Sequence, residues 1–434
     1  MPVSVAVVGS GPAGFYTAEA LVNLGEDVSI DLIDRLPTPF GLIRGGVAPD
    51  HQTTKKVTKK YEKTALQEQV RYFGNVEVGR DVSLEELREI YDAVVLAIGA
   101  PCDRKLNIPG EDKEGVFGSA DFVGWYNGHP DFRDLNPDLN VSSAVVIGVG
   151  NVAIDVARLL VRTREEFSTA DITDYAERAI LESPIDDVHI LGRRGPIEAK
   201  FTNVELREMG KLVQSVPVVD AGQLPADAGE LPDREKRLKE KNLETLRQFS
   251  ERKPDELPKR VHFGFYASPV EILGGDRVEG LRLERTRVEN GRAVGTGEFF
   301  EIECGLVVAA IGYLADPFEG APYDEKGGII PNDDGRVDDG LYVAGWIKRG
   351  PTGVISSNRP DGAAVASHIQ QDFSADGSKP GRTGLENLLK ERNVRAVSYA
   401  DWKKIEAAEI ENAEGDHPRK KFVTIQDMLD VLDS

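Results

Sequence analysis

Residues 3–14 read Val-Ser-Val-Ala-Val-Val-Gly-Ser-Gly-Pro-Ala-Gly, and this stretch decides the fold. An apolar strand of the buried type runs into a glycine turn, and helix-forming residues follow from Phe15. In that context a G-x-G-x-x-G pattern predicts dinucleotide binding. Gly9 permits the tight turn, Gly11 lets the backbone approach a pyrophosphate, and Gly14 lets the helix pack on the strand. The pyrophosphate would meet backbone N–H groups at the positive end of that helix.

A second fingerprint occupies residues 144–153, where the strand Ala-Val-Val-Ile precedes Gly148-Val149-Gly150-Asn151-Val152-Ala153. The alanine at its third glycine position is an accepted variant of the pattern. Two such units in one chain predict two dinucleotides that exchange electrons. The predicted fold class is therefore α/β, with two Rossmann-like dinucleotide-binding domains.

The residues that end the next strand of each unit separate the two ligands. The strand at 28–33 ends at Asp34, about 20 residues beyond the last glycine, where an acid binds the ribose hydroxyls. The strand at 188–191 instead runs into Gly192-Arg193-Arg194-Gly195. Two guanidiniums suit a 2′-phosphate, because each presents a planar fork of donors. The first site is predicted to bind FAD and the second NADP rather than NAD. Away from a Rossmann unit, the same arginines would more simply belong to a solvated loop.

Composition limits the class of protein and its surroundings. With 434 residues, 40% of them hydrophobic and 29% charged, the chain fits a soluble protein of two domains without a membrane-inserted segment. A strand begins by residue 3, so we expect no signal or transit peptide. The lone Cys102 and Cys304 have neither C-x-x-C nor metal-ligand spacing, and the six histidines are scattered. These features favour a reducing cytoplasm and predict no metal site and no dithiol relay.

A net charge of −21 argues against nucleic-acid binding and requires positive charge to be local where anions bind. Besides the arginine pair, two segments offer it. Lys55, Lys59 and Lys63 are spaced to share one face of a helix. Residues 224–260 are rich in both charges and predict a helix, bounded by Pro232 and Pro254, that projects from the NADP domain. For any single lysine, a solvated surface helix is the simpler interpretation.

Two apolar strands that end in small residues, at 92–100 and 306–313, suggest an internally duplicated architecture. A further strand at 341–346 and a helix near 361–371 return the chain to the first domain. We therefore expect an NADP-binding domain at 105–315, inserted into a discontinuous FAD-binding domain formed by 1–104 and 316–434. In the tail after Ser374, two short helices are expected around 385–389 and 425–429.

Several long motifs resemble the adrenodoxin-reductase-type ferredoxin–NADP reductases, within the glutathione-reductase-like flavoproteins. They occur in the same order from residue 1 to about 370, and they are the first fingerprint, Pro37-Thr-Pro-Phe-Gly-Leu-Ile-Arg-Gly-Gly-Val-Ala-Pro-Asp-His51, residues 121–127, 150–158 and 192–196, and Gly345-Trp-Ile-Lys-Arg-Gly-Pro-Thr-Gly-Val-Ile355. The resemblance implies FAD contacts at Ala13, Asp34, Leu42, Val78, Trp346, Gly353, Val354 and Ile355. It implies NADP contacts at Gly148, Val149, Gly150, Asn151, Arg193, Arg194, Glu205 and Gly353. Where this chain has Asp34 the family usually has Glu.

The resemblance also implies a reaction: NADPH delivers a hydride to FAD, and single electrons then pass to a small acidic ferredoxin. It places His51 and Glu205 near the nicotinamide and the flavin, as a hydrogen-bonded pair that could hold the nicotinamide amide or relay protons. Spacing alone would make His51 a helix-start residue after Asp50, and Trp346 a core residue. We expect Trp346 to lie against the flavin, and the positive N-terminus of the helix after Gly353 to face the flavin ring.

Other function classes are open at this stage or excluded by missing residues. A disulfide reductase needs a cysteine pair beside the flavin, and a subunit of the glutamate synthase type needs cysteine-rich cluster ligands; this chain has neither. An FAD/NADPH monooxygenase, or an NADPH oxidoreductase with a quinone as acceptor, would share the nucleotide motifs. The choice of ferredoxin, the oligomeric state, the flavin potential, the direction of electron flow and the role of the tail are left open.

Overall fold

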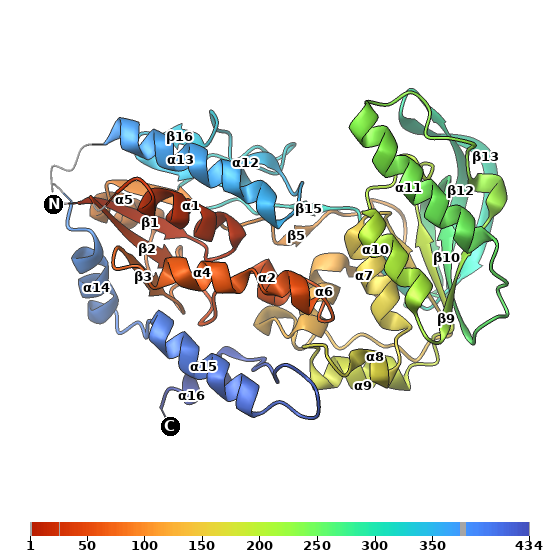
Figure 1. Cartoon of the computed structure of the whole chain (residues 1–434), viewed down its shortest axis with the longest axis horizontal. Helices are drawn as coiled ribbons and strands as arrows, with labels where there is room; N and C mark the ends of the chain where they lie inside the picture. The colour runs from red at the N-terminus through yellow and green to blue at the C-terminus, as the bar shows by residue number, and fades with distance from the viewer. Residues whose placement is uncertain (1, 26, 374–378, 434) are drawn as a thin grey trace.

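The computed structural model describes residues 2–25, 27–373 and 379–433, which form two lobes joined through the middle of the molecule (Figure 1). The sheet of the first lobe has the order β16-β17-β4-β1-β2-β3. Its strands β17, β4, β1, β2 and β3 are parallel and β16 is antiparallel. The strands are β1 (Val3–Val8), β2 (Val28–Ile33), β3 (Val70–Phe73), β4 (Ala93–Leu96), β16 (Arg336–Asp338) and β17 (Leu341–Val343).

The sheet of the second lobe is parallel throughout, with the order β6-β14-β7-β8-β10-β9. Its strands are β6 (Val116–Gly118), β7 (Ser143–Ile147), β8 (Asp187–Leu191), β9 (Ser215–Val219), β10 (Lys259–Gly264) and β14 (Leu306–Ala309). All of them lie between two strands of the first sheet in the sequence, β4 and β16. The expected fold class is therefore confirmed: a second nucleotide-binding unit is inserted into a discontinuous first one.

A short antiparallel ribbon lies where the chain crosses between the lobes. β5 (Cys102–Asp103) leaves the first lobe and pairs with β15 (Tyr313–Leu314), which returns to it (Figure 1). Two crossings at one place are what an inserted domain requires. The domain boundaries at 104/105 and 315/316 stay a prediction.

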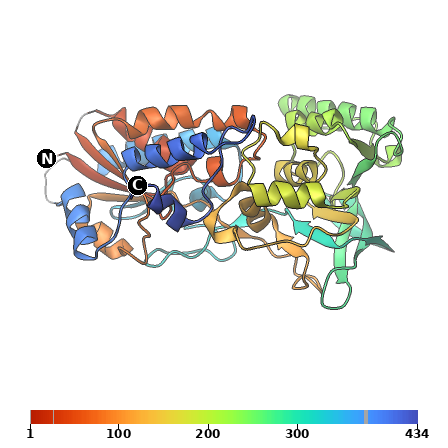
Figure 2. The same cartoon turned by 90° about the horizontal axis from the view of Figure 1, so that it is seen from below.

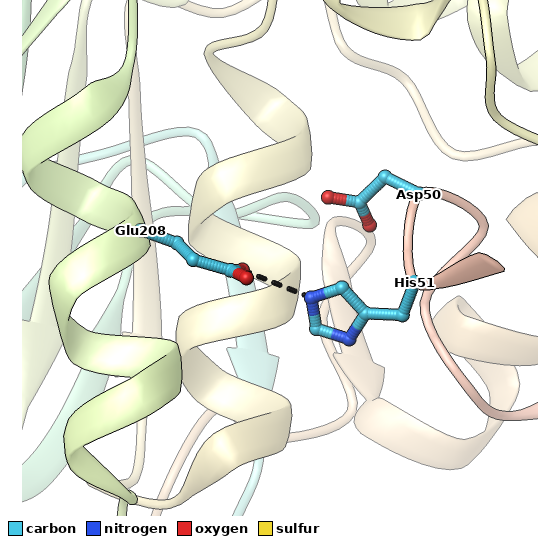
Figure 3. Close-up of side chains that lie close together, drawn as sticks. All are labelled: Asp50, His51 and Glu208. Atoms are coloured by element: carbon cyan, nitrogen blue, oxygen red, sulfur yellow. Dashed lines mark hydrogen bonds and ion pairs between the residues drawn. The ribbon is translucent and has the colours of Figure 1, made fainter. Parts of the chain in front are cut away.

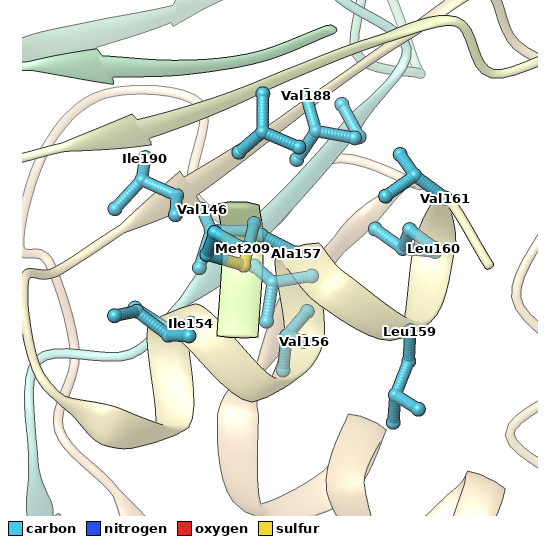
Figure 4. Close-up of a cluster of buried hydrophobic side chains, with 14 of the residues drawn as sticks. Val146, Ile154, Val156, Ala157, Leu159, Leu160, Val161, Val188, Ile190 and Met209 are labelled. Atoms are coloured by element: carbon cyan, nitrogen blue, oxygen red, sulfur yellow. The ribbon is translucent and has the colours of Figure 1, made fainter. Parts of the chain in front are cut away.

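Helices cover both sheets and bury their apolar faces. In the first lobe α1 (Pro12–Val22) packs against α13 (Asn358–Asp372), and in the second α7 (Asn151–Leu160) packs on β7 and β8, with Ala157 beside Val146 (Figure 4). The other helices are α2 (Leu42–Gly45), α3 (Gln52–Lys55), α4 (Thr58–Ala65), α5 (Leu84–Ile90), α6 (Ser119–Asn127), α8 (Arg164–Phe167), α9 (Asp174–Glu182), α10 (Asn203–Glu208), α11 (Asp233–Ser250), α12 (Trp346–Arg349), α14 (Arg382–Glu391), α15 (Tyr399–Glu411) and α16 (Ile425–Asp430). Short 3-10 turns are η1 (Pro130–Phe132), η2 (Met209–Lys211), η3 (Ala221–Gln223) and η4 (Ile355–Ser357). No helix in the described part of the chain is long and apolar enough to cross a membrane.

An antiparallel sheet that the sequence did not predict covers the other face of the second lobe. It consists of β11 (Ala267–Leu273), β12 (Gly280–Glu289) and β13 (Arg292–Glu303). Leu281 and Leu283 of β12 pack with Val145 and Leu191 of the parallel sheet. The hairpin turn at Asn290-Gly291 has positive φ at both residues, 49° and 73°, which suits an Asn-Gly pair.

The expected basic helix face at Lys55, Lys59 and Lys63 is wrong in one respect. The helix is broken between α3 and α4, and Lys55 is buried, with its Nζ 2.5 Å from Asp171 Oδ1 in the other lobe. A lysine bearing no such partner would not be buried there, because desolvating its charge is costly. Lys59 and Lys63 are exposed, as is Lys56 beside them.

The expectation that the charged helix projects from the second lobe is also wrong in part. α11 begins after Pro232, as expected, but its C-terminal half buries Leu243, Leu246 and Phe249 and packs on β9. Only its N-terminal half is exposed along its whole surface. In the tail, α14 and α16 contain the two short helices that were expected, whereas α15 was not predicted.

The tail lies beside the first lobe (Figure 2) and is bound to both lobes by buried charges. Glu409 of α15 is fully buried and lies 2.5 Å from Arg44 Nη2. Lys421 is buried too, and it donates to the carbonyl oxygen of Asn127 at 3.0 Å. The tail thus contacts α2 of the first lobe and α6 of the second lobe together.

Candidate functional site

A cavity of about 1270 Å³ extends from the first fingerprint to the second lobe. Among the residues expected at the cofactor sites, those that line it are Gly9, Gly11, Ala13, Asp34, Leu42, His51, Val78, Asn151, Glu205, Trp346, Gly353, Val354 and Ile355. Gly14, Gly148, Val149, Gly150, Arg193 and Arg194 do not line this cavity. The first group comes from segments far apart in the sequence, so the fold gathers them around one space.

The glycines of both fingerprints divide into blocked and open positions. A Cβ on Gly9 would lie 2.5 Å from the carbonyl oxygen of Ala97, and one on Gly14 would lie 1.9 Å from that of Gly9. A Cβ on Gly11 would meet nothing closer than 3.9 Å, and one on Gly150 nothing within 4 Å. The open positions are the second glycines, where the pattern requires a phosphate to approach the backbone.

Asp34 stands at the end of β2 and is already hydrogen-bonded. Its Oδ2 accepts from the backbone N–H of Ser10 at 2.8 Å and from the Ser10 hydroxyl at 2.5 Å, and its Oδ1 accepts from the N–H of Leu36. Burial raises the pKa of Asp34, and the bonds from Ser10 and Leu36 oppose that rise without cancelling it. The acid is therefore fixed in place, and one face of it lines the cavity.

Arg193 and Arg194 line a separate cavity of about 590 Å³, between the end of β8 and the β12–β13 hairpin. Arg194 Nη1 donates to the carbonyl oxygen of Gly291 at 3.2 Å, and Thr286 Oγ1 donates to the carbonyl oxygen of Arg193 at 2.7 Å. Within the described residues neither guanidinium has an ion-pair partner. The hairpin, which was not predicted, thus forms the second wall of the arginine site.

His51 lies where the two lobes meet and faces carboxylates from α10 (Figure 3). Its Nε2 is 3.4 Å from Glu205 Oε2 but not hydrogen-bonded to it, as the expected pair would have been; the hydrogen bond is instead to Glu208 Oε2, at 2.9 Å. Glu208 was missed, although it follows Glu205 by three residues and so shares its helix face. His51 therefore has two acidic neighbours rather than one.

Arg158 of α7 is the centre of the cluster. It lies in the family motif at 150–158, but no role was predicted for it. Its side chain is fully buried, and its nitrogens lie 3.0 Å from Asp50, Asp155 and Glu208. Its Nη2 is also 2.9 Å from His51 Nε2. His51 does stand at the start of α3, as the simple interpretation had it, but Asp50 contacts Arg158 and Arg162 instead of capping that helix.

The same side chains include two sets close enough to ligate a metal, Asp50-His51-Glu208 and His51-Asp155-Glu205. A guanidinium 3.0 Å from three of these carboxylates already supplies the cation there. A divalent ion would have to share the space with a charge of its own sign. The cluster is therefore better explained as a network of ion pairs.

Burial and charge move the pKa values of this cluster in different directions. Burial and Arg158 would lower the pKa of His51, but the hydrogen bond to Glu208 and the charges of Asp155 and Asp50 together outweigh them, so the pKa is raised. Burial raises the pKa of Glu205 and of Asp155. For Glu208 burial is outweighed by His51 and Arg158, so its pKa is lowered. The groups most ready to carry a proton are His51 and Glu205.

Oε2 of Glu205 is buried without a hydrogen-bond partner among the described residues, whereas Oδ1 of Asp155 is paired with Arg158 Nη1 at 3.0 Å. Both residues line the large cavity. Buried acceptors without donors are rare in folded proteins, and a ligand with N–H groups would satisfy this one. A carboxamide is such a ligand.

Trp346 begins α12 rather than ending a strand, since β17 stops at Val343. Its ring lies 5.8 Å from that of Tyr313, centroid to centroid, and it lines the cavity. Val354 of the following turn is exposed in the same space. The tryptophan is thus a wall of the cavity and not only a core residue.

Two glycine turns, one followed by an acid and the other by two arginines, with a shared cavity between them, define a pyridine-nucleotide oxidoreductase with two dinucleotide sites. Residues 3–194 match the family model described as pyridine nucleotide-disulphide oxidoreductase. The chain is 42% identical to the mitochondrial NADPH:adrenodoxin oxidoreductase of Arabidopsis thaliana, over 99% of this chain and 95% of the relative. It is 40% identical to the NADPH-ferredoxin reductase FprA of Mycobacterium leprae, over 98% of each chain.

Among solved structures, Mycobacterium tuberculosis FprA in complex with NADPH superposes with a TM-score of 0.94, at 39% identity over 100% of both chains. The protein therefore belongs to the family of NADPH:adrenodoxin oxidoreductases and NADPH-ferredoxin reductases. The resemblance found in the motifs is confirmed, and it extends through the tail, since these relatives align over nearly the whole chain.

Proposed function

We propose that the protein is an FAD-dependent NADPH–ferredoxin reductase, that is, a ferredoxin–NADP⁺ reductase. The observation that carries the proposal is the pairing of two unlike dinucleotide sites, Asp34 after one turn and Arg193-Arg194 after the other, around the cluster of His51 and Glu205. The names of relatives aligned over nearly the whole chain support it.

The residues of the first lobe fit FAD. Gly11 leaves open space over its backbone at the start of α1, where a pyrophosphate would sit, and Asp34 stands beside it for the ribose. Leu42, Val78, Trp346 and the turn at Gly353-Val354-Ile355 would enclose the remainder of the cofactor. Asp34 has a shorter side chain than the Glu that the family usually has here, and hydrogen bonds from Ser10 hold its carboxylate in place.

The residues of the second lobe fit NADPH. Gly148, Val149, Gly150 and Asn151 form the turn for its pyrophosphate, and Arg193 and Arg194 are free to bind its 2′-phosphate. The unsatisfied Oε2 of Glu205 is suited to the amide of the nicotinamide. When bound, FAD supplies the chemistry, accepting a hydride from NADPH and releasing electrons singly. The chain's own residues orient the two cofactors, exclude water, and hold protons at His51 Nε2 and Glu205.

The electron acceptor would be a small acidic iron–sulfur ferredoxin, and two exposed basic surfaces suit it. One consists of Lys56, Lys59 and Lys63, replacing the expected face that included Lys55; the other consists of Arg234, Lys236, Arg237 and Lys241 at the exposed start of α11. Reversing several of these charges to Glu should raise the apparent KM for ferredoxin and leave NADPH–ferricyanide activity nearly unchanged, because ferricyanide needs no docking surface. Unchanged ferredoxin kinetics would refute both surfaces.

The cellular setting is proposed to be the cytoplasm. Cys102 and Cys304 are free, which suits a reducing compartment. The domains are proposed to be 1–104 with 316–434 for FAD, and 105–315 for NADP.

One experiment tests the function directly. The purified protein should be yellow, with one FAD and no stoichiometric iron or zinc, and anaerobic NADPH should bleach it. Stopped-flow mixing with candidate ferredoxins should then reoxidise it. If NADPH bleaches the protein but only oxygen or a quinone reoxidises it, the monooxygenase or quinone alternative replaces this proposal. If NADPH does not bleach it, the enzyme class is wrong.

A further inference from the structure

The two hydrogen-bonding neighbours of His51 Nε2 require opposite protonation states of this nitrogen. A guanidinium only donates, so Arg158 Nη2 at 2.9 Å requires a lone pair on Nε2. The carboxylate of Glu208, also at 2.9 Å, requires a proton on the same nitrogen. One imidazole nitrogen cannot satisfy both neighbours at once. The structure therefore places His51 between two competing partners.

We propose that Arg158 is a positioning residue that holds His51 able to gain and lose a proton during turnover, instead of leaving it permanently paired with Glu208. Arg158 has a fully buried side chain and does not line the cavity, whereas His51, Asp155 and Glu205 do. Any effect of Arg158 on bound nucleotides therefore passes through these neighbours. This inference rests on the proposed function.

The proposed reaction releases a proton that the cluster could take up. A hydride carries two electrons and one proton, and the two electrons leave singly for two ferredoxins without a proton. Oxidation of one NADPH by two ferredoxins thus releases one proton in each turnover. A histidine at the cavity wall with an acceptor on one side and a cation on the other can take up that proton and release it.

The charged and titratable groups around His51 come from three helices and from the chain next to them. They are Asp50 beside it, Asp155 and Arg158 of α7, Arg162 just after α7, Glu205 and Glu208 of α10, and Tyr126 of α6. If all are ionised, the four carboxylates outnumber the two guanidiniums, so the surroundings favour a protonated histidine. Arg158 is the cation that contacts the ring and opposes this. Arg162, just beyond the end of α7, contacts Asp50 instead.

The test is a titration of His51 in the FAD-loaded enzyme. ¹³C-labelled histidine Cε1 signals are followed by NMR against pH, with His51→Gln used only to assign the signal. In Arg158→Met the midpoint should move to higher pH, by on the order of one unit, the effect of one nearby charge. Arg158→Lys should move the midpoint in the same direction but less. The lysine keeps the positive charge, but its single ammonium cannot contact Asp50, Glu208 and His51 together.

Two further variants separate this role from simple structural support. Glu208→Gln removes the negative charge that favours a protonated His51, so the midpoint should move to lower pH. Arg162→Met, the matched control, also removes a buried arginine from Asp50, and it should leave the midpoint near that of the parent. The kcat/KM for NADPH with ferricyanide should follow the same order of pH midpoints.

The proposal is overturned if the Arg158 variants leave the His51 midpoint in place or move it no further than Arg162→Met does. It is also overturned if Glu208→Gln fails to lower the midpoint, a measurement that stands even if Arg158→Met does not fold. Failure of the proposed function would show differently, as absence of flavin bleaching by NADPH, while the titration of His51 could still be measured.

Discussion

The ends of β2 and β8 occupy the same position in the two nucleotide-binding units, but the residues that follow them have opposite chemical character. After β2, Asp34 accepts hydrogen bonds from Ser10, the middle residue of the first glycine turn. After β8, the corresponding place holds Gly192, over which Val149 of the second turn packs. The polar pair fixes an acid in a cavity wall, whereas the arginines that follow the apolar pair have no acidic partner among the residues that the structure describes.

This difference suits a cofactor that stays and a substrate that exchanges. A hydrogen-bonded acid needs no reorganisation when its ligand binds, which favours tight retention. Free guanidiniums keep their charge for an incoming phosphate and release it again without breaking a competing ion pair. One fold thus gives a resident site and an exchangeable site through the residues next to each turn.

The largest expected effect tests the third position of each turn, Gly14 in one unit and Ala153 in the other. A Cβ on Gly14 would lie 1.9 Å from a backbone oxygen, while the Cβ of Ala153 is accommodated in a fully buried position. Gly14→Ala should therefore cost on the order of 3 kcal/mol or more and abolish FAD retention. The measurement is FAD absorbance per protein after desalting, together with thermal unfolding.

Ala153→Gly is the matched control on the other unit. It should lower stability by only about 1 kcal/mol, the usual cost of glycine in a helix, and leave FAD bound. Full FAD occupancy in Gly14→Ala would show that the turn of the first unit is less constrained than its geometry indicates.

The next effect tests the exchangeable site. Arg193→Ala or Arg194→Ala removes a charged donor to the 2′-phosphate and should cost on the order of 2 kcal/mol, or tens-fold in KM for NADPH. The KM for NADH should change little. Arg287→Ala removes an arginine of the same lobe that is paired with Glu289, and it serves as the control. Equal losses for NADPH and NADH in the Arg193 and Arg194 variants would refute the 2′-phosphate assignment.

The contrast between local and long-range contacts also explains what the sequence could predict. The turns, Asp34 and the arginine pair are local features within single βα units, and all were found from spacing. Arg158 and Glu208 become neighbours of His51 only when the lobes meet, so no spacing reveals that contact. Lys55 looked like a surface residue because its partner Asp171 is distant in the sequence, and β13 was missed because most of its residues are exposed and two of them are glycines.

A pH-dependent effect is expected at the junction of the two units. Burial would raise the pKa of Asp171, but Lys421 of the tail and Lys55 of the first lobe outweigh it and lower the pKa to about 2. A lowered pKa stabilises the fold above the unfolded value of 3.8, and that stability is lost as pH falls from there towards 2. The contribution is at most about 2 kcal/mol.

Chemical unfolding of the parent and of Asp171→Asn from pH 7 down to pH 2 measures this contribution. The parent should lose its advantage over the variant between about pH 4 and pH 2. A stability difference that stays constant over this range would mean that the carboxylate of Asp171 does not titrate in the way its two lysine partners require.

The smallest expected effect tests the hydrogen bond that holds Asp34 in place at the FAD site. Ser10→Ala removes the hydroxyl bond to Asp34 but keeps the backbone N–H bond, so the acid should stay near its place with less support. The loss should be about 1 kcal/mol, or roughly fivefold in the Kd for FAD, read from the recovery of flavin fluorescence on dilution. Val149→Ala changes the corresponding residue of the second unit and should leave the Kd for FAD unchanged, because no acid follows β8. If both variants weaken FAD binding equally, the effect comes from a general loosening of the fold. The contrast between a hydrogen-bonded acid and unpaired arginines would then not explain why one nucleotide stays bound and the other exchanges.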